Sequence, residues 1–263
     1  MRFAPVFVLC WAAPVAKADM SVLNNVTADV VILGEIHDNP QHHVMQGAAI
    51  IALAPKAVVF EMLTAAQSGL ITPDLQQDMD SLGQVLGWDA SGWPPFADYA
   101  PIFRAAATAQ IYGGALTDPA INQVFSSGAA AVFGADAAAY GLTQPLAPAD
   151  QTAREGEQRD AHCGKLPEAM LGGMVQVQRA RDAMLARAVV AAWDATGGPV
   201  VVITGSGHAR RDTGIPAVLV LARPDLTVFS LALTEQPLPA NAPFDAWVLT
   251  DAIDRPDPCL AFE

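Results

Sequence analysis

The stretch VVILGEIHDN, residues 30–39, decides the fold class, because an apolar β-branched run stops at Gly34 and is followed at once by ligand-type side chains. The apolar run predicts a buried strand over Ala28–Leu33. Glu35 and His37 then lie on the loop beyond its carboxyl end, two residues apart and able to point the same way. Ligands collect at the carboxyl ends of strands in open α/β sheets, so this loop is a candidate site.

A helix and a second strand follow this loop. Pro40 can open a helix over Pro40–Ala54, on which Val44, Ala48, Ile51 and Ala52 recur on one face. The next β-branched run is Ala57–Phe60. Strand, helix, strand in this order is typical of a parallel sheet with helices on its faces and right-handed crossovers. We therefore predict an α/β fold.

The middle of the chain has a different composition. From Thr72 to Ala192, alanine, glutamine and paired charges dominate, which predicts a mainly helical insertion at about residues 72–195 that caps the sheet, with a long helix over Pro167–Asp194. β-Branched runs before and after it predict the remaining strands, Pro199–Thr204, Thr227–Leu233 and Phe244–Leu249.

The first residues have the order of a secretory signal peptide. Arg2 precedes an apolar run, and an A-x-A site at residues 16–18 stands before Asp19. We expect cleavage after residue 18, leaving residues 19–263 as a single periplasmic domain. A lipid anchor is not expected, because Leu9 stands before Cys10 where a lipoprotein signal has a small residue.

The net charge limits the kinds of partner that the protein can bind, and the cysteines indicate a disulfide or a ligand. The formal net charge is −13, from 27 acidic and 14 basic residues, which opposes binding to nucleic acid or anionic lipid.

Two cysteines, Cys163 and Cys259, follow the signal peptide. In an oxidising compartment they could form a disulfide. They could also remain separate thiols, or Cys163 could act as a ligand beside His162.

Three strand ends carry polar groups to one edge of the predicted sheet. Glu35 and His37 follow the first strand and Glu61 the second, while His208 follows the glycine-rich turn Gly205-Ser206-Gly207. Two carboxylates and two imidazoles could hold a divalent metal, or run acid–base catalysis without one. Each residue alone could instead cap a helix or simply be hydrogen-bonded.

Two further groups are candidates for ligand binding. Arg210 and Arg211 follow the glycine-rich turn and suit a carboxylate or phosphate, although the Walker lysine is absent. Aromatic residues are dense in residues 87–103, which could line an apolar slot or form the core of the helical cap. They are Trp88, Trp93, Phe96, Tyr99 and Phe103. The phenol of Tyr99 could also ligate haem iron.

Taken together, the stretches GEIHDNPQHH, VVFEM, WDASGWPPFADYAPIF, HCGKLP, QRARDAM and GSGHARRDTGIPAVL resemble the ChaN family of haem-binding proteins. The superfamily also holds erythromycin esterases and Tiki metalloproteases. The resemblance implies an α/β fold with a helical insertion, export, haem binding linked to dimerisation, and a role in iron acquisition. It selects Glu35, His37, Glu61, His208 and Arg210 as site residues, and leaves Tyr99 or His162 as candidates for the iron ligand.

The leading hypothesis is a periplasmic haem-binding protein in iron uptake, with haem as ligand, a homodimer as its assembly and components of a haem transporter as possible partners. The aromatic residues would meet the macrocycle, and arginine or histidine would pair with its propionates. The alternative is a metal-dependent hydrolase that uses Glu35, His37, Glu61 and His208. A third possibility is an exported α/β domain whose polar rim binds another small molecule.

Overall fold

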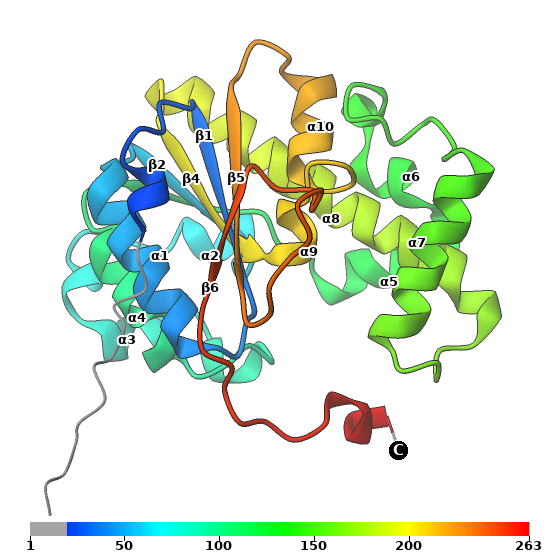
Figure 1. Ribbon diagram of the computed structural model, residues 1–263. Helices are drawn as coiled ribbons and strands as arrows, with labels where there is room; N and C mark the ends of the chain where they lie inside the picture. Colours follow the sequence, from blue (N-terminus) through cyan, green and yellow to red (C-terminus); the bar gives the residue numbers. More distant parts are fainter. Residues whose placement is uncertain (1–19, 263) are drawn as a thin grey trace, which may run out of the picture.

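The computed structural model describes residues 20–262 and contains one open sheet of six parallel strands in the order β3-β2-β4-β1-β5-β6 (Figure 1). The predicted parallel α/β fold is therefore confirmed. The predicted signal peptide lies outside the described residues. The strands are β1 (Val30–Glu35), β2 (Ala57–Phe60), β3 (Gln110–Gly113), β4 (Val200–Gly205), β5 (Val228–Thr234) and β6 (Ala246–Leu249).

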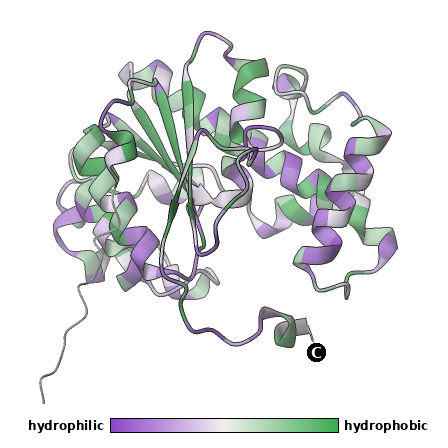
Figure 2. Ribbon diagram, viewed as in Figure 1, coloured by the Kyte–Doolittle hydropathy of each residue, from purple (hydrophilic) through white to green (hydrophobic). Residues whose placement is uncertain are grey.

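The central strands are buried on both faces, because their β-branched and aromatic side chains alternate between two separate cores. Figure 2 shows these strands as the most apolar part of the ribbon. Val31, Leu33 and Phe60 face one core, while Val30 and Ile32 face the other. Register pairs Glu35 with Gly205, so the ends of β1 and β4 meet at the same height.

One face of the sheet is covered by α1 (Pro40–Leu53), α3 (Met79–Val85) and α4 (Phe96–Ala105), with the short α2 (Ala65–Ser68) following β2. The helices α1 and α4 pack closely at Gly47, where an added Cβ would lie 3.1 Å from the carbonyl oxygen of Pro101. The other face is covered by α8 (Glu168–Thr196), α9 (Ser206–Ala209) and α10 (Ile215–Ala222).

A third core forms where α5 (Asp118–Ser127) and α6 (Ala129–Phe133) pack on the first half of α8. The helix α7 (Pro148–Ala161) packs against α8 on the same side of the molecule (Figure 1). Short 3₁₀ turns complete the chain: η1 (Ser21–Leu23), η2 (Leu75–Gln77), η3 (Trp88–Ala90), η4 (Ala135–Ala138) and η5 (Pro258–Phe262).

The helical insertion predicted at residues 72–195 is interrupted, because β3 joins the sheet at its edge beside β2. Its residues Gln110–Gly113 are partly exposed and lack the apolar run of a central strand, which is why composition alone missed it. The helices α3 and α4 cover the sheet, whereas α5 to α7 form the additional helical layer. The long helix predicted at Pro167–Asp194 is found at Glu168–Thr196, unbroken at its paired glycines.

The apolar face predicted for α1 is the wrong one. Val44 and Ile51 are 58% and 72% exposed, whereas His42, His43 and Gln46 are completely buried. His42 and Gln46 each form a hydrogen bond, and Nε2 of His43 lies 3.5 Å from Oε1 of Glu35. Gln46, for example, donates from Nε2 to the carbonyl oxygen of Leu33 at 3.1 Å.

The C-terminal segment after β6 runs along the lower edge of the molecule toward the side of α5 and α7 (Figure 1). Cys259 forms a disulfide with Cys163, just beyond α7, across a sequence separation of 96 residues. Arg255 pairs with Asp38 and Glu235 on the way. Within residues 20–262, no helix is both long and apolar enough to cross a bilayer.

Candidate functional site

Glu35 is the last residue of β1, and its buried carboxylate is surrounded by three side chains from other positions. Its Oε1 atom accepts a hydrogen bond from the hydroxyl of Tyr99 at 2.7 Å and lies 2.8 Å from Nδ1 of His37. Nε2 of His43 is 3.5 Å from the same oxygen. Burial opposes the negative charge, but the contacts with His37 and His43 outweigh it and lower the pKa of Glu35.

Glu61 follows β2 and reaches across to the end of β4. Its Oε2 accepts hydrogen bonds from the Thr204 hydroxyl and the Gly205 amide, both at 2.7 Å. Burial alone would raise the pKa of Glu61, but the charges on His208 and His37 and the Gly205 amide hold it well below its usual range. The carboxylate is therefore ionised at neutral pH.

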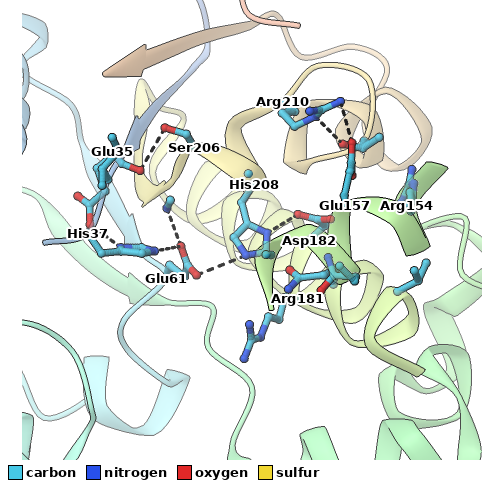
Figure 3. Close-up of a pocket in the computed structure, with 18 of the residues that line it drawn as sticks. Glu35, His37, Glu61, Arg154, Glu157, Arg181, Asp182, Ser206, His208 and Arg210 are labelled. Atoms are coloured by element: carbon cyan, nitrogen blue, oxygen red, sulfur yellow. Dashed lines mark hydrogen bonds and ion pairs between the residues drawn. The ribbon is translucent and has the colours of Figure 1, made fainter. Parts of the chain in front are cut away.

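His208 lies on α9 between two carboxylates. Nε2 is 3.4 Å from Oε1 of Glu61, and Nδ1 is 2.6 Å from Oδ1 of Asp182 on α8 (Figure 3). Burial disfavours the imidazolium, yet the two carboxylates outweigh burial and raise the pKa of His208 to about 10. The ring is thus a charged, fixed group rather than a neutral base at pH 7.

His37 links the two carboxylates and is the more accessible imidazole, with a side chain 32% exposed. Its Nε2 lies 3.9 Å from Oε2 of Glu61 and against Gly205, where an added Cβ would come within 2.6 Å of that nitrogen. Burial lowers the pKa of His37, but the hydrogen bond to Glu35 and the charge of Glu61 raise it overall. Gly205 thus provides the space in which the ring of His37 lies.

These groups line a cavity of about 740 Å³ between the carboxyl edge of the sheet and the helices α7 and α8 (Figure 3). The structure brings together six of the residues predicted from sequence, namely Glu35, His37, Glu61, His208, Arg210 and Trp93. Arg210 pairs with Asp212 at 2.8 Å and approaches Glu157 at 3.5 Å.

Four predicted ligand-binding residues do not line this cavity. Arg211 points elsewhere and pairs with Asp245 at 2.9 Å. Trp88 and Tyr99 belong to the core on the α4 face of the sheet, and their ring centroids are 5.0 Å apart. His162 caps α7, with Nδ1 2.8 Å from the Gln158 carbonyl oxygen.

The aromatic segment is therefore mainly core, and Trp93 is its member at the cavity. The ring centroid of Trp93 is 4.8 Å from that of His37. Trp93 and Phe96 are only partly buried, whereas Tyr99 and Phe103 are completely buried. The dense aromatics thus fill the space between α4 and the sheet, as the alternative interpretation of this segment proposed.

The prediction that Glu35, His37, Glu61 and His208 form a metal site receives no support from the geometry. Among residues 20–262, no group of three or more histidine, cysteine, aspartate or glutamate side chains is arranged to hold a metal ion. The carboxylates and imidazoles face one another as ion pairs instead. The pair of His37 and Glu35 is at hydrogen-bond distance, 2.8 Å, whereas His208 and Glu61 are 3.4 Å apart.

Comparison with known families matches residues 23–219 to a family described as haem-binding uptake, Tiki superfamily, ChaN. The chain belongs to this family. No curated protein matches. A solved structure titled "Cofacial heme binding to ChaN of Campylobacter jejuni" is similar at 20% identity and a TM-score of 0.66, covering 87% of this chain and 89% of that one.

A second solved structure, titled "The structure of the type III effector HopBA1", covers 78% of this chain and 77% of its own at 12% identity. Its TM-score of 0.42 is too low to support an argument. The similarity to the Campylobacter protein shows that this ChaN-family chain shares its fold.

Sequence reasoning missed several residues of the site in this ChaN-family chain. Asp182, Arg154 and Arg181 line the cavity, and His43 contacts Glu35 from below. Asp182 and Arg181 lie in the stretch QRARDAM, which carried part of the family resemblance without any role in the site. Adjacent residues of a helix are expected to point in different directions, so only one of His42 and His43 should face inward, but both are completely buried.

Proposed function

We propose that this chain binds haem and acts in the uptake of haem iron as an exported, periplasmic protein. The observation that carries the proposal is the match to the haem-binding uptake family over residues 23–219, which includes every residue of the polar cluster. The disulfide between Cys163 and Cys259 is in keeping with an oxidising compartment.

The position of the haem follows from which apolar side chains remain accessible. The faces of a porphyrin need apolar contacts, and most of the residues that line the cavity have charged or polar side chains. Trp93, which precedes α4, and Phe96, the first residue of α4, are only partly buried. We therefore place the macrocycle on Trp93 and Phe96, with Trp93 at the edge of the polar cluster, where its ring centroid is 4.8 Å from that of His37.

The iron ligand is the next question, and His162 suits this role better than Tyr99. The Tyr99 side chain is fully buried, and its hydroxyl donates to Glu35. Burial and the negative charge of Glu35 raise the pKa of Tyr99 far above its usual range, so its phenolate is not accessible. His162 is partly exposed, and a contact such as that of Nδ1 with the Gln158 carbonyl commonly orients an imidazole ligand.

A haemin titration of the purified protein, followed by its Soret absorbance, tests this function. We expect saturable binding of haemin by the wild-type chain. The double variant W93A/F96A should weaken it at least tenfold, and H162A should change the position of the Soret band. Phe125→Ala is the matched control, because Phe125 is an exposed aromatic residue on α5. Absence of a Soret shift in the wild type at stoichiometric haemin refutes the proposal.

Hydrolysis is the second candidate, and the observation that favours it is the cluster of Glu35, His37, Glu61 and His208 in one cavity. Without a metal geometry, such a reaction would depend on acid–base chemistry. It is the weaker candidate, because His208 is held as an imidazolium and Glu61 as a carboxylate by their mutual contact. Ester or amide turnover by the wild type that Glu35→Gln abolishes would favour hydrolysis.

A further inference from the structure

Two arginines of the large cavity have no anionic partner within the described part of the chain. Arg154 on α7 and Arg181 on α8 both line the cavity and are partly buried. Neither forms an ion pair or donates a hydrogen bond among the contacts of residues 20–262, and Nε of Arg154 is buried without a partner. Unpaired guanidinium groups are unexpected in a chain with 27 acidic residues.

The carboxylates that line the large cavity are already engaged by other groups. Both oxygens of Glu61 are in use, with Thr204 and Gly205 at one and His208 at the other. Asp182 holds His208. Glu157 pairs with Arg210. The acidic side chains of the large cavity therefore form no ion pair with Arg154 or Arg181.

Arg181 is the better placed of the two. It also lines a smaller neighbouring cavity of about 170 Å³ that shares Glu61 and Trp93 with the large one. Figure 3 shows its side chain leaving α8 beside the ion pair of Glu61 and His208. A guanidinium group in a concave, partly buried position gives a local positive potential and a fork that matches two anionic oxygens.

We propose that Arg181 is the anchor of a binding site for a small organic anion, whose carboxylate or phosphate group pairs with its guanidinium. The rest of the ligand then lies against the ring of Trp93 and the imidazole of His37, whose ring centroids are 4.8 Å apart. Arg154 adds a second positive charge to the lining of the cavity. Burial raises the pKa of Asp182, and the charges of His208 and Arg154 oppose this rise. The anion site lies around Arg181 in the cavity, and it shares Trp93 with the proposed haem surface.

The test uses isothermal titration of the full mature chain with succinate and, in parallel, with inorganic phosphate, at an ionic strength held constant with sodium chloride. We expect saturable binding of at least one of these probes, and the stronger probe shows whether the site prefers a carboxylate or a phosphate. Arg181→Gln should weaken binding at least tenfold. Arg181→Lys should recover only part of the loss, because lysine keeps the charge without the fork.

Arg104→Gln is the matched control, because Arg104 is an exposed arginine of α4 outside the cavity. It should leave the affinity unchanged. Failure of both probes to bind saturably overturns the proposal, as does equal affinity of the wild type and Arg181→Gln when circular dichroism shows both to be folded. Haemin titration of the wild type and of Arg181→Gln measures haem binding separately from succinate and phosphate binding, so failure of the anion site and failure of haem binding are distinguished.

Discussion

Nδ1 of His208 lies 2.6 Å from Oδ1 of Asp182, although the two residues belong to different helices and are 26 positions apart in the chain. Glu61 approaches the other ring nitrogen. An imidazole held at both nitrogens by carboxylates keeps both protons and a fixed orientation. The contact between α9 and α8 therefore decides the charge state at the centre of the cavity.

Replacing Asp182 with asparagine should lower the pKa of His208 from its value of about 10, because one of the two carboxylates that stabilise the imidazolium is lost. NMR titration of the imidazole resonances measures this directly. Asp160→Asn, at an exposed position of α7, should leave the titration as in the wild type. An unchanged pKa in Asp182→Asn would show that Glu61 alone holds the proton.

The stability of the protein should fall on the alkaline side. The pKa of His208 is raised in the folded state from 6.5 to about 10, so the folded chain holds a proton that the unfolded chain releases. This contribution is complete below pH 6.5 and is lost as the pH rises towards 10. The free energy of unfolding, measured with urea from pH 7 to 10, should decline. The decline should be smaller in His208→Gln, and equal slopes would contradict the assignment.

Acid should destabilise the protein through His42. Burial lowers the pKa of His42 to about 4. In the folded protein Nδ1 of the ring accepts a hydrogen bond from the Ile36 amide, and Nε2 is hydrogen-bonded to the Thr250 hydroxyl. Between pH 6.5 and 4, His42 binds a proton in the unfolded chain but not in the folded chain. Stability should fall over this window, and His42→Gln should reduce the slope. The same slope in the variant would assign the effect to other groups.

The disulfide between Cys163 and Cys259 should stabilise the fold by about 2–4 kcal/mol, because it restricts the unfolded chain across 96 residues. The double variant C163S/C259S should lose this amount in urea unfolding. Cys10→Ser is the control, and it should leave the free energy of unfolding unchanged. In addition, the tail should become more open to proteolysis after Arg255, whose pairs with Asp38 and Glu235 then hold the segment alone. Equal cleavage of both proteins would exclude a tethering role.

Tyr99→Phe should destabilise the protein by about 1–3 kcal/mol, because the Tyr99 hydroxyl donates to a completely buried carboxylate. The loss should appear as a lower melting temperature with unchanged secondary structure. Tyr112→Phe is the control, since its hydroxyl contacts only an exposed glutamine. Equal melting temperatures for the two variants would show that Glu35 does not need Tyr99.

Much of the site could be predicted from the order of residues at three strand ends. A β-branched run cannot continue past Gly34 with charged side chains in the core, so Glu35 and His37 had to lie at a strand end, and the same reasoning applies to Glu61 and His208. Parallel strands then brought these residues to one edge. The fold class and the rim of the cavity were therefore determined by local sequence.

Only the tertiary structure decided which helix face is buried and which partners complete the site. Val44 and Ile51 of α1 are apolar yet exposed. His42 is buried because the Ile36 amide and the Thr250 hydroxyl satisfy its ring, and His43 is buried with Nε2 3.5 Å from Oε1 of Glu35. Asp182 faces His208 because the long helix α8 crosses the sheet at that height, and no spacing along the chain encodes this. The sequence by itself determined the strands and their polar ends, since those depend on neighbours in the chain. The charges of the cavity were decided by packing, because each pKa depends on groups that meet only in the folded protein.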